Sequence, residues 1–344
     1  MIHTSFKNAF TLTELLAVFA VVALLATIAV PAIHATSQAR GQVVCLANLR
    51  EIGRASLFYA TDDAREQIVP LHRMAVSTLI GTGFGGTEWS WRTALPSAYG
   101  GRTPVTPFPT ESGVVTIMLD ENGYWGTPTR PLNSYISGDL GLGDDLDVFH
   151  CPADSGYPDA EWVWDAPQEA AGIPCWDFLG NSYRINTLGV TWLSGSLRTG
   201  ALPSGPWGHW ASSLASPLAE TVLYCEPLFF NWAYVAAWGE QLPPVPGWHG
   251  EILSDHVAYC DGSARMTEMG ELYEFSDEEL YEMGYTTAFP GRYFLRRGPT
   301  WQMDCYPTPG ALIRVFAPNG QPMTPSFPYT GWPFDNYQYN LPPE

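Results

Sequence analysis

The chain has 344 residues, of which 46% are hydrophobic and 15% charged, and its 35 acidic and 16 basic side chains give a formal charge of −19. Nucleic-acid binding depends on clustered lysines and arginines, so this acidic balance argues against a nucleic-acid ligand. The length allows one large domain, and 33 glycines and 30 prolines predict that this domain is rich in turns and loops.

The first predicted element is an apolar stretch from Leu15 to Ile33, interrupted only by Thr27 and Pro31. About 20 apolar residues cross the hydrocarbon core of a bilayer as a helix, so this stretch is predicted to span a membrane. A single carboxylate, Glu14, stands at its head. A charge at bilayer depth costs at least about 2.5 kcal/mol and usually faces a partner, so Glu14 is predicted to have a function.

Two simpler interpretations of the apolar stretch fit less well. A signal anchor with an incidental glutamate is disfavoured because carboxylates inside membranes are rare. A cleaved secretory signal has an apolar core of roughly 7 to 15 residues followed by its small-residue cleavage site. Here the apolar run is longer, and the small residue Ala9 precedes it.

Beyond Pro31 the pattern becomes amphipathic. A stripe of side chains recurs at intervals of four, three, four and three residues, which is the spacing of one helix face. The stripe consists of Cys45, Leu49, Ile52, Ser56 and Tyr59. Phe10 to about Ala60 is therefore predicted to be one helix of roughly 75 Å, with residues 10–33 in the membrane and 34–61 as the spine of a soluble head. Pro31 predicts either a bend near the membrane edge or local melting within an assembly.

Residues 62–266 are predicted to form the head and 267–344 a C-terminal extension rich in proline and aromatic residues. Three runs of β-branched or aromatic residues predict strands, at Val114 to Leu119, Thr221 to Cys225 and His256 to Cys260. Ser276 and Glu279 form a capping box that predicts a helix to Met283. The expected fold class is α+β, with the long N-terminal helix packed on an antiparallel sheet that carries long loop insertions.

An acidic run before the middle of the chain is a candidate for calcium binding. Its members are Asp139, Asp144, Asp145 and Asp147, which lie among glycines, with Asp154 further on. Calcium takes several carboxylate and carbonyl oxygens from flexible loops. The run does not follow the ligand spacing of an EF-hand, so a solvated acidic loop is the favoured interpretation and calcium the alternative.

The strongest candidate for catalysis is a group of ionisable residues near the end of the head, namely His249, Asp255, His256 and Asp261. Such groups bind a metal or share a proton. However, no spacing here matches a His-Glu-x-x-His zinc site, a nucleophile elbow or a phosphate loop. A histidine and an aspartate around a strand turn more often hold that turn by hydrogen bonds, so the sequence predicts a protein that is not an enzyme.

The segment from Lys7 to Leu16, KNAFTLTELL, resembles the start of type IV pilin-like proteins, which include type IV pilins and the pseudopilins of type II secretion. In that family a prepilin peptidase removes a short basic leader, and the new N-terminal residue is methylated. The resemblance implies a leader at residues 1–9, cleavage between Ala9 and Phe10, and a role for Glu14 in assembly.

The implied assembly has a physical basis. The free amine made at Phe10 is positively charged and can meet Glu14 of a neighbouring subunit, and paired charges tolerate a low dielectric better than single ones. Helices drawn from the bilayer into a filament would be aligned by this pair. Pro31 also falls where many pilins have a proline, which implies that it takes part in the assembled helix.

Further segments are similar to a large bacterial family of prepilin-type proteins whose head ends in a signature called H-X9-DG. They are Cys45 to Gly53, Tyr59 to Asp62, Val148 to Asp154, Asn181 to Asn186 and His256 to Ala264. The histidine of the signature corresponds to His249, and eleven residues, instead of nine, separate it from Asp261 and Gly262. The resemblance covers residues 1 to about 266.

The resemblance implies a single-pass inner-membrane protein whose head lies in the periplasm before it enters a filament or reaches the surface. Its implied partners are the prepilin peptidase, other pilin or pseudopilin subunits and the membrane. Cysteines in that compartment can form disulfides. Because the family places Cys225 and Cys260 in one sheet, they are the first expected pair and Cys151 with Cys175 the second, with buried free thiols as the alternative.

Two functions fit these observations. The first is a structural pilin or pseudopilin subunit of a type IV pilus-like or type II secretion filament. The second is a membrane-tethered surface protein that uses the leader only for export and binds a ligand such as a polysaccharide through its tryptophans. Aromatic side chains stack on sugars, but they also fill cores and interfaces.

Overall fold

The computed structural model describes part of the chain. Two further stretches are described only as short strands. The described residues are 12–62, 68, 70, 95–110, 113–123, 125–138, 146–163, 166–186, 218–237, 242–274, 276 and 297–303, with the strands at 315–316 and 322–323 and without the side chains of 31–38, 95, 115, 117 and 237. The chain divides into two compact units, residues 1–43 and 44–344. Ala9, Phe10, three aspartates of the acidic run and residues 277–283 of the predicted helix lie outside the described residues.

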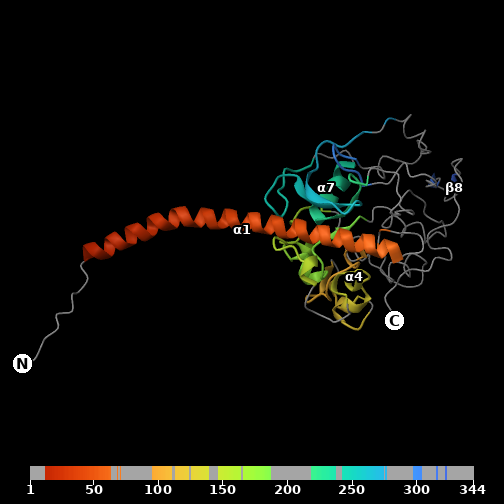
Figure 1. The fold of residues 1–344 in the computed structure, drawn as a ribbon, viewed down its shortest axis with the longest axis horizontal. Helices are drawn as coiled ribbons and strands as arrows, with labels where there is room; N and C mark the ends of the chain where they lie inside the picture. The colour runs from red at the N-terminus through yellow and green to blue at the C-terminus, as the bar shows by residue number, and fades with distance from the viewer. Residues whose placement is uncertain are drawn as a thin grey trace, which may run out of the picture. The chain divides into compact units, whose positions relative to one another are not determined.

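The N-terminal unit consists of the first part of helix α1, which runs from Leu12 to Asp62 (Figure 1). Its residues Leu12–Val30 have a mean hydropathy of 2.4, and none of this stretch is buried. By length and composition it is able to cross a membrane. The helix continues through Pro31, so the prediction of one long helix is confirmed for the described residues.

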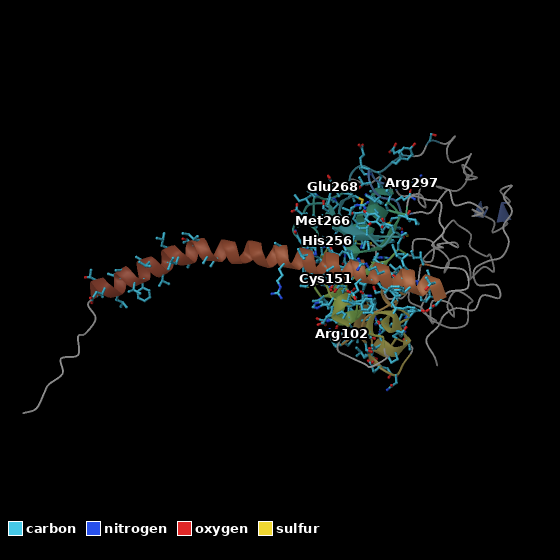
Figure 2. All side chains as sticks on the ribbon, in the orientation of Figure 1. Arg102, Cys151, His256, Met266, Glu268 and Arg297 are labelled. Carbon is cyan, nitrogen blue, oxygen red and sulfur yellow. A yellow bond between two sulfur atoms is a disulfide. The ribbon has the colours of Figure 1, made fainter. Side chains whose placement is uncertain are left out.

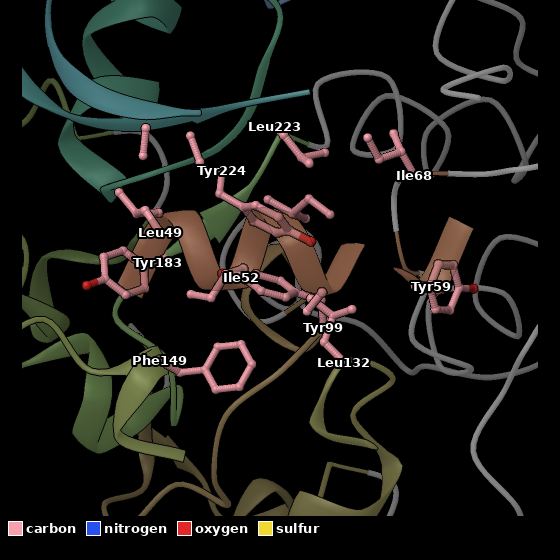
Figure 3. Close-up of a cluster of buried hydrophobic side chains, with 14 of the residues drawn as sticks. Leu49, Ile52, Tyr59, Ile68, Tyr99, Leu132, Phe149, Tyr183, Leu223 and Tyr224 are labelled. Carbon is pink, nitrogen blue, oxygen red and sulfur yellow. The ribbon is translucent and has the colours of Figure 1, made fainter. Parts of the chain in front are cut away.

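In the second unit, the last part of α1 forms one side of the main core. The predicted stripe is confirmed, because each of its five side chains is at most 1% exposed. Arg50, Glu51 and Arg54 lie on the opposite, exposed side. Figure 3 shows Leu49 and Ile52 among the aromatic rings of other segments, including Tyr183 and Tyr224. The amphipathic pattern therefore identified the face that packs into the head.

A four-stranded antiparallel sheet supplies the other side of this core. In spatial order its strands are β3 (Arg184–Ile185), β4 (Val222–Cys225), β5 (Ser254–Tyr259) and β6 (Ala264–Glu268). Tyr224 pairs with Ala258, and Ala258 pairs with Ala264 across the β5–β6 hairpin. The strands predicted at 221–225 and 256–260 are confirmed with small shifts at their ends.

The strand predicted at Val114 to Leu119 is only half correct. Residues Gly113–Val115 form β2, which pairs with β1 (Phe108–Thr110) in a separate two-stranded sheet. The next residues turn into the 3₁₀ helix η2 (Ile117–Leu119). β-branched residues favour strands through the neighbours they pack on, so a local run does not fix where the strand ends.

Helix α7 (Pro227–Ala237) follows β4 directly, and sequence reasoning did not predict it. Proline suits the first turn of a helix because its missing N–H is not needed there. Side chains on all sides of α7 are buried, and these include Leu228, Phe229, Phe230 and Trp232. A helix that is apolar all round belongs in a core. The run was therefore too uniformly apolar to show helical periodicity.

The remaining elements are short. They are α3 (Leu95–Ser97), η3 (Thr127–Thr129), α4 (Asn133–Ser137), η4 (Leu146–Phe149), η5 (Gln168–Ala170), α5 (Cys175–Phe178), β7 (Val315–Phe316) and β8 (Pro322–Met323). Residues 297–303, within the predicted extension, pack into the head: the Gln302 N–H donates to the Glu220 carbonyl, and the Trp301 indole N–H donates to that of Met269. Helix and antiparallel sheet are thus both present, as the expected α+β class requires.

Candidate functional site

A buried disulfide joins the last part of α1 to the segment that follows η4. It links Cys45, on the buried stripe of α1, to Cys151, and the two Cα atoms are 5.4 Å apart. The bond closes a loop with a sequence separation of 106 residues. In the chain-entropy model, closing a loop of about 100 residues contributes about 4.7 kcal/mol to stability. The helix that carries the apolar segment is therefore covalently fastened to the rest of the head.

The two expected disulfides are wrong. Cys225 pairs in register with Val257, whereas Cys260 follows Tyr259, the partner of Val222. Because β4 and β5 are antiparallel, the two cysteines lie at opposite ends of β4, roughly 13 Å apart at about 3.3 Å per residue. That distance is well beyond the reach of a disulfide.

The second expected pair fails for a different reason. Cys151 is already bonded to Cys45, and Cys175 lies in a separate hydrophobic cluster. Cys175, Cys225 and Cys260 are all buried free thiols. Buried thiols, the stated alternative, are thus what the structure has at these three positions.

Next to the disulfide lies a buried carboxylate with two histidines. Glu226 stands at the junction of β4 and α7, His249 in the turn before β5, and His256 on β5 itself; Cys151 and His256 are labelled in Figure 2. His249 Nε2 is 2.9 Å from Glu226 Oε1, and the backbone N–H of His256 donates to Glu226 Oε2 at 3.2 Å. An ionised carboxylate only accepts hydrogen bonds, so Nε2 of His249 carries the proton.

The electrostatics of this cluster favour the ionised form of Glu226. Burial alone raises the pKa of its carboxyl, but the hydrogen bonds and charges of His249 and His256 outweigh burial and hold the pKa below its ordinary value. The centres of the two imidazole rings lie 4.1 Å apart, and both side chains are at most 1% exposed. The cluster is therefore a charged centre enclosed within the head.

The structure separates the members of the predicted catalytic group. His249 and His256 come together, but Asp255 is the neighbour of His256 on β5, and successive strand residues point to opposite faces. Asp261 is exposed at the β5–β6 turn, where its Oδ1 accepts the Ser263 N–H at 2.9 Å. Glu226, which the sequence prediction missed, takes the central place instead.

The histidine and the Asp-Gly pair of the H-X9-DG signature thus lie in different parts of the head. Asp261 and Gly262 make the hairpin turn, and Gly262 adopts a φ of 80°, which a residue with a side chain rarely adopts. A Cβ on Gly53 of α1 would lie 3.5 Å from the Gly262 Cα, so the turn packs on that helix. His249 contributes to the buried cluster and not to the turn. The aspartate therefore holds the turn as predicted, without the histidine.

Other predicted site residues are placed as follows. Glu14 lies in the first turn of α1 and is exposed, and Pro31 lies within that helix. Asp147 is exposed in η4, while the other three members of the calcium candidate fall outside the described residues. Asp154 faces inward, where its carboxylate accepts hydrogen bonds from the head itself. Because most of the acidic run lies outside the described residues, calcium binding there stays a prediction.

Comparisons with protein-family models, with curated proteins and with solved structures gave no significant match.

Chemically, the site combines a disulfide bond with a buried carboxylate–imidazole pair. A signal for Glu226 was present in the sequence, because it is the only charged residue in the apolar run from Thr221 to Phe230. A carboxylate in such a run is costly unless it is paired, which is the same reasoning that singled out Glu14.

Proposed function

We propose that this chain is a structural pilin or pseudopilin subunit that a prepilin peptidase processes and that assembles into a type IV pilus-like or type II secretion filament. The observation that carries the proposal is the dual character of α1. Residues Leu12–Val30 of this helix are exposed and apolar, and its last turns are part of the core of the head. A subunit that is stored in a membrane and polymerises through its N-terminal helix needs both properties.

The exposed part of α1 needs an apolar environment. Its large side chains, among them Leu12, Phe19 and Ile28, are between about half and three quarters exposed. Burying apolar surface contributes roughly 25 cal/mol per Å², so lipid or a bundle of like helices stabilises this segment. Glu14 lies at the start of the same segment, where the amine of Phe10 from an adjacent copy is its proposed counter-ion.

The buried cluster fits a subunit more than an enzyme. Glu226, His249 and the disulfide are enclosed, and together they tie α1 to the β4–α7 junction and the turn before β5. Pulling on a filament loads the connection between the N-terminal helix and its head. We assign the cluster the role of keeping that connection intact.

The tethered-binder alternative has less support. A polysaccharide-binding face requires exposed aromatic rings. Among the tryptophans that the structure describes, Trp125, Trp232 and Trp301 are at most 1% exposed, and the others are buried or half-buried. These three rings fill the interior of the head and are therefore not available to a ligand.

Glu14→Ala tests the proposal. The variant is expected to be processed and to stay in the membrane, but to yield no filaments, because Phe10 of the next subunit loses its counter-ion. Glu51→Ala, which removes an exposed glutamate of the same helix within the head, is the matched control and keeps normal filaments. Electron microscopy of sheared filaments and immunoblots of membrane fractions provide the measurement. Normal filaments from Glu14→Ala would favour the tethered binder.

A further inference from the structure

Four ligand-bearing side chains converge at the disulfide. Cys45, Cys151, Glu226 and His249 each supply one atom able to bind a metal, all four residues are buried, and these atoms lie within 4.8 Å of one another. They come from α1, the segment after η4, the β4–α7 junction and the turn before β5. All four belong to the same compact unit.

The distances already approach those of a coordination shell. Zinc binds sulfur at about 2.3 Å and nitrogen or oxygen at about 2.0–2.2 Å, so neighbouring ligand atoms in a tetrahedron lie about 3.3 to 3.8 Å apart. Here Cys151 Sγ is 3.4 Å from Glu226 Oε1 and 3.5 Å from His249 Nε2. The third edge, from His249 Nε2 to Glu226 Oε1, is 2.9 Å.

A disulfide by itself does not explain these neighbours. A disulfide is uncharged and packs well among apolar side chains, whereas a buried carboxylate and imidazole lose their hydration. Both of these polar groups lie within 3.5 Å of the same sulfur atom, Cys151 Sγ. Polar groups of metal-ligating type around two cysteines are, in contrast, what a zinc site requires.

We propose that the reduced form of this cluster is a structural zinc site with Cys45, Cys151, His249 and Glu226 as its ligands. A dithiol reductant supplies two electrons and two protons, becomes a disulfide itself, and cleaves the bond between Cys45 and Cys151. The metal then replaces the two thiol protons. Nε2 of His249 gives up its proton, to Nδ1 where the ring is neutral and to solvent where it is charged, so that Nε2 is free to bind.

The site has the features of a structural zinc centre. Four protein ligands close the tetrahedron and leave no position for water, which distinguishes structural from catalytic sites. His256 completes the surroundings, because its Nδ1 lies 3.5 Å from Glu226 Oε1 and can hold the carboxylate in place. Disulfide and zinc are then two alternative ways in which one cluster fastens α1 to the head.

Metal uptake by the reduced full-length chain tests this inference. The protein in detergent is reduced with dithiothreitol under argon, freed of reductant by gel filtration, and titrated with Co²⁺ and then Zn²⁺. We expect about one equivalent of metal, with tetrahedral cobalt bands and sulfur-to-cobalt charge transfer, and no stoichiometric uptake by the oxidised chain. His249→Gln should weaken the affinity at least about tenfold.

Variants of the cysteines make the assignment specific. Cys151→Ser is expected to abolish stoichiometric uptake, whereas Cys175→Ala, which removes a buried thiol outside the cluster, retains it. The inference is overturned if the reduced chain takes up less than about 0.1 equivalent, or if Cys151→Ser and Cys175→Ala bind metal equally well. If reduction unfolds the chain, recovery of the near-ultraviolet circular dichroism on adding Zn²⁺ supports the site, and failure to recover overturns it.

Discussion

Asp154 shows how a single side chain organises the loops of the head. Its carboxylate accepts the hydroxyl of Ser182 at 2.7 Å and the backbone N–H groups of Gly156, Cys175 and Trp176 at 2.8 to 3.0 Å. It thereby fastens the segment after Cys151 to the start of α5. Burial raises its pKa to about 6, in spite of these four hydrogen bonds.

This shift predicts a dependence of stability on pH. The pKa of Asp154 is about 6 in the folded chain and about 3.9 in an unfolded one, so the folded state binds the proton more tightly. The stability due to protonation is fully present below about pH 4 and is lost as the pH rises through 6. Urea unfolding between these limits is expected to show this loss in the native chain but not in Asp154→Asn. Identical slopes in both proteins would contradict the assignment.

The free cysteines give a second test at this scale. Burial raises the pKa of Cys225 to about 12 and that of Cys175 well above its usual range. Only the thiolate is nucleophilic, so Cys175, Cys225 and Cys260 should resist iodoacetamide in the folded chain and react after denaturation. Cys45 and Cys151 should stay unlabelled until a reductant is added. Peptide mass spectrometry reads out each site, and labelling of Cys225 in the folded chain would count against its burial.

At the scale of elements, α1 is one continuous helix whose first and last parts have different surroundings. Up to Val30 its side chains are exposed and almost wholly apolar, and from Cys45 onward one face is buried among aromatic side chains of the sheet and loops. Ser56 also hydrogen-bonds Tyr224 of β4, so a polar residue on the buried stripe is satisfied. The packing of α1 is therefore a large part of what holds the head together.

Truncating that buried face should destabilise the head. Ile52 is fully buried in the main core, and Ile52→Ala is expected to cost about 2 to 5 kcal/mol, as large-to-small core substitutions do. Arg54→Ala, on the exposed side of the same turn, should change the free energy of unfolding by no more than about 0.5 kcal/mol. Denaturant titrations of both variants with the disulfide intact provide the comparison. Equal effects would mean that α1 does not pack as described.

At the scale of the whole molecule, the proposed function makes a prediction about the mature chain. If a prepilin peptidase acts on it, the N-terminal peptide from membranes should begin with N-methylated Phe10, and Glu14 should then be the fifth residue of the mature protein. Mass spectrometry of that peptide decides the matter. An intact Met1 in the membrane fraction, or a water-soluble monomer that retains residues 1–9, would rule out the proposed pathway.

The elements that local pattern controls were predictable. Hydrophobicity over successive residues was enough for the apolar segment, and the spacing from Cys45 to Tyr59 was enough for the buried face of α1, because helix periodicity is a property of neighbouring residues. The strands β4 and β5 were predictable for a similar reason. Helix α7 was not, since its apolar residues show no periodicity that separates a buried helix from a buried strand.

Cysteine pairing and the charged cluster were decided by the tertiary structure alone. Cys45 and Cys151 are 106 residues apart, and Glu226 meets His249 across the return from α7 to β5. No local sequence pattern predicts these long-range contacts, because they depend on strand direction and on which helix face is covered. The sequence by itself determined that the chain has an apolar N-terminal helix with an amphipathic continuation. Only the antiparallel order of β4 and β5, and the packing of α1 against them, decided which sulfur, carboxylate and imidazole groups share one buried space.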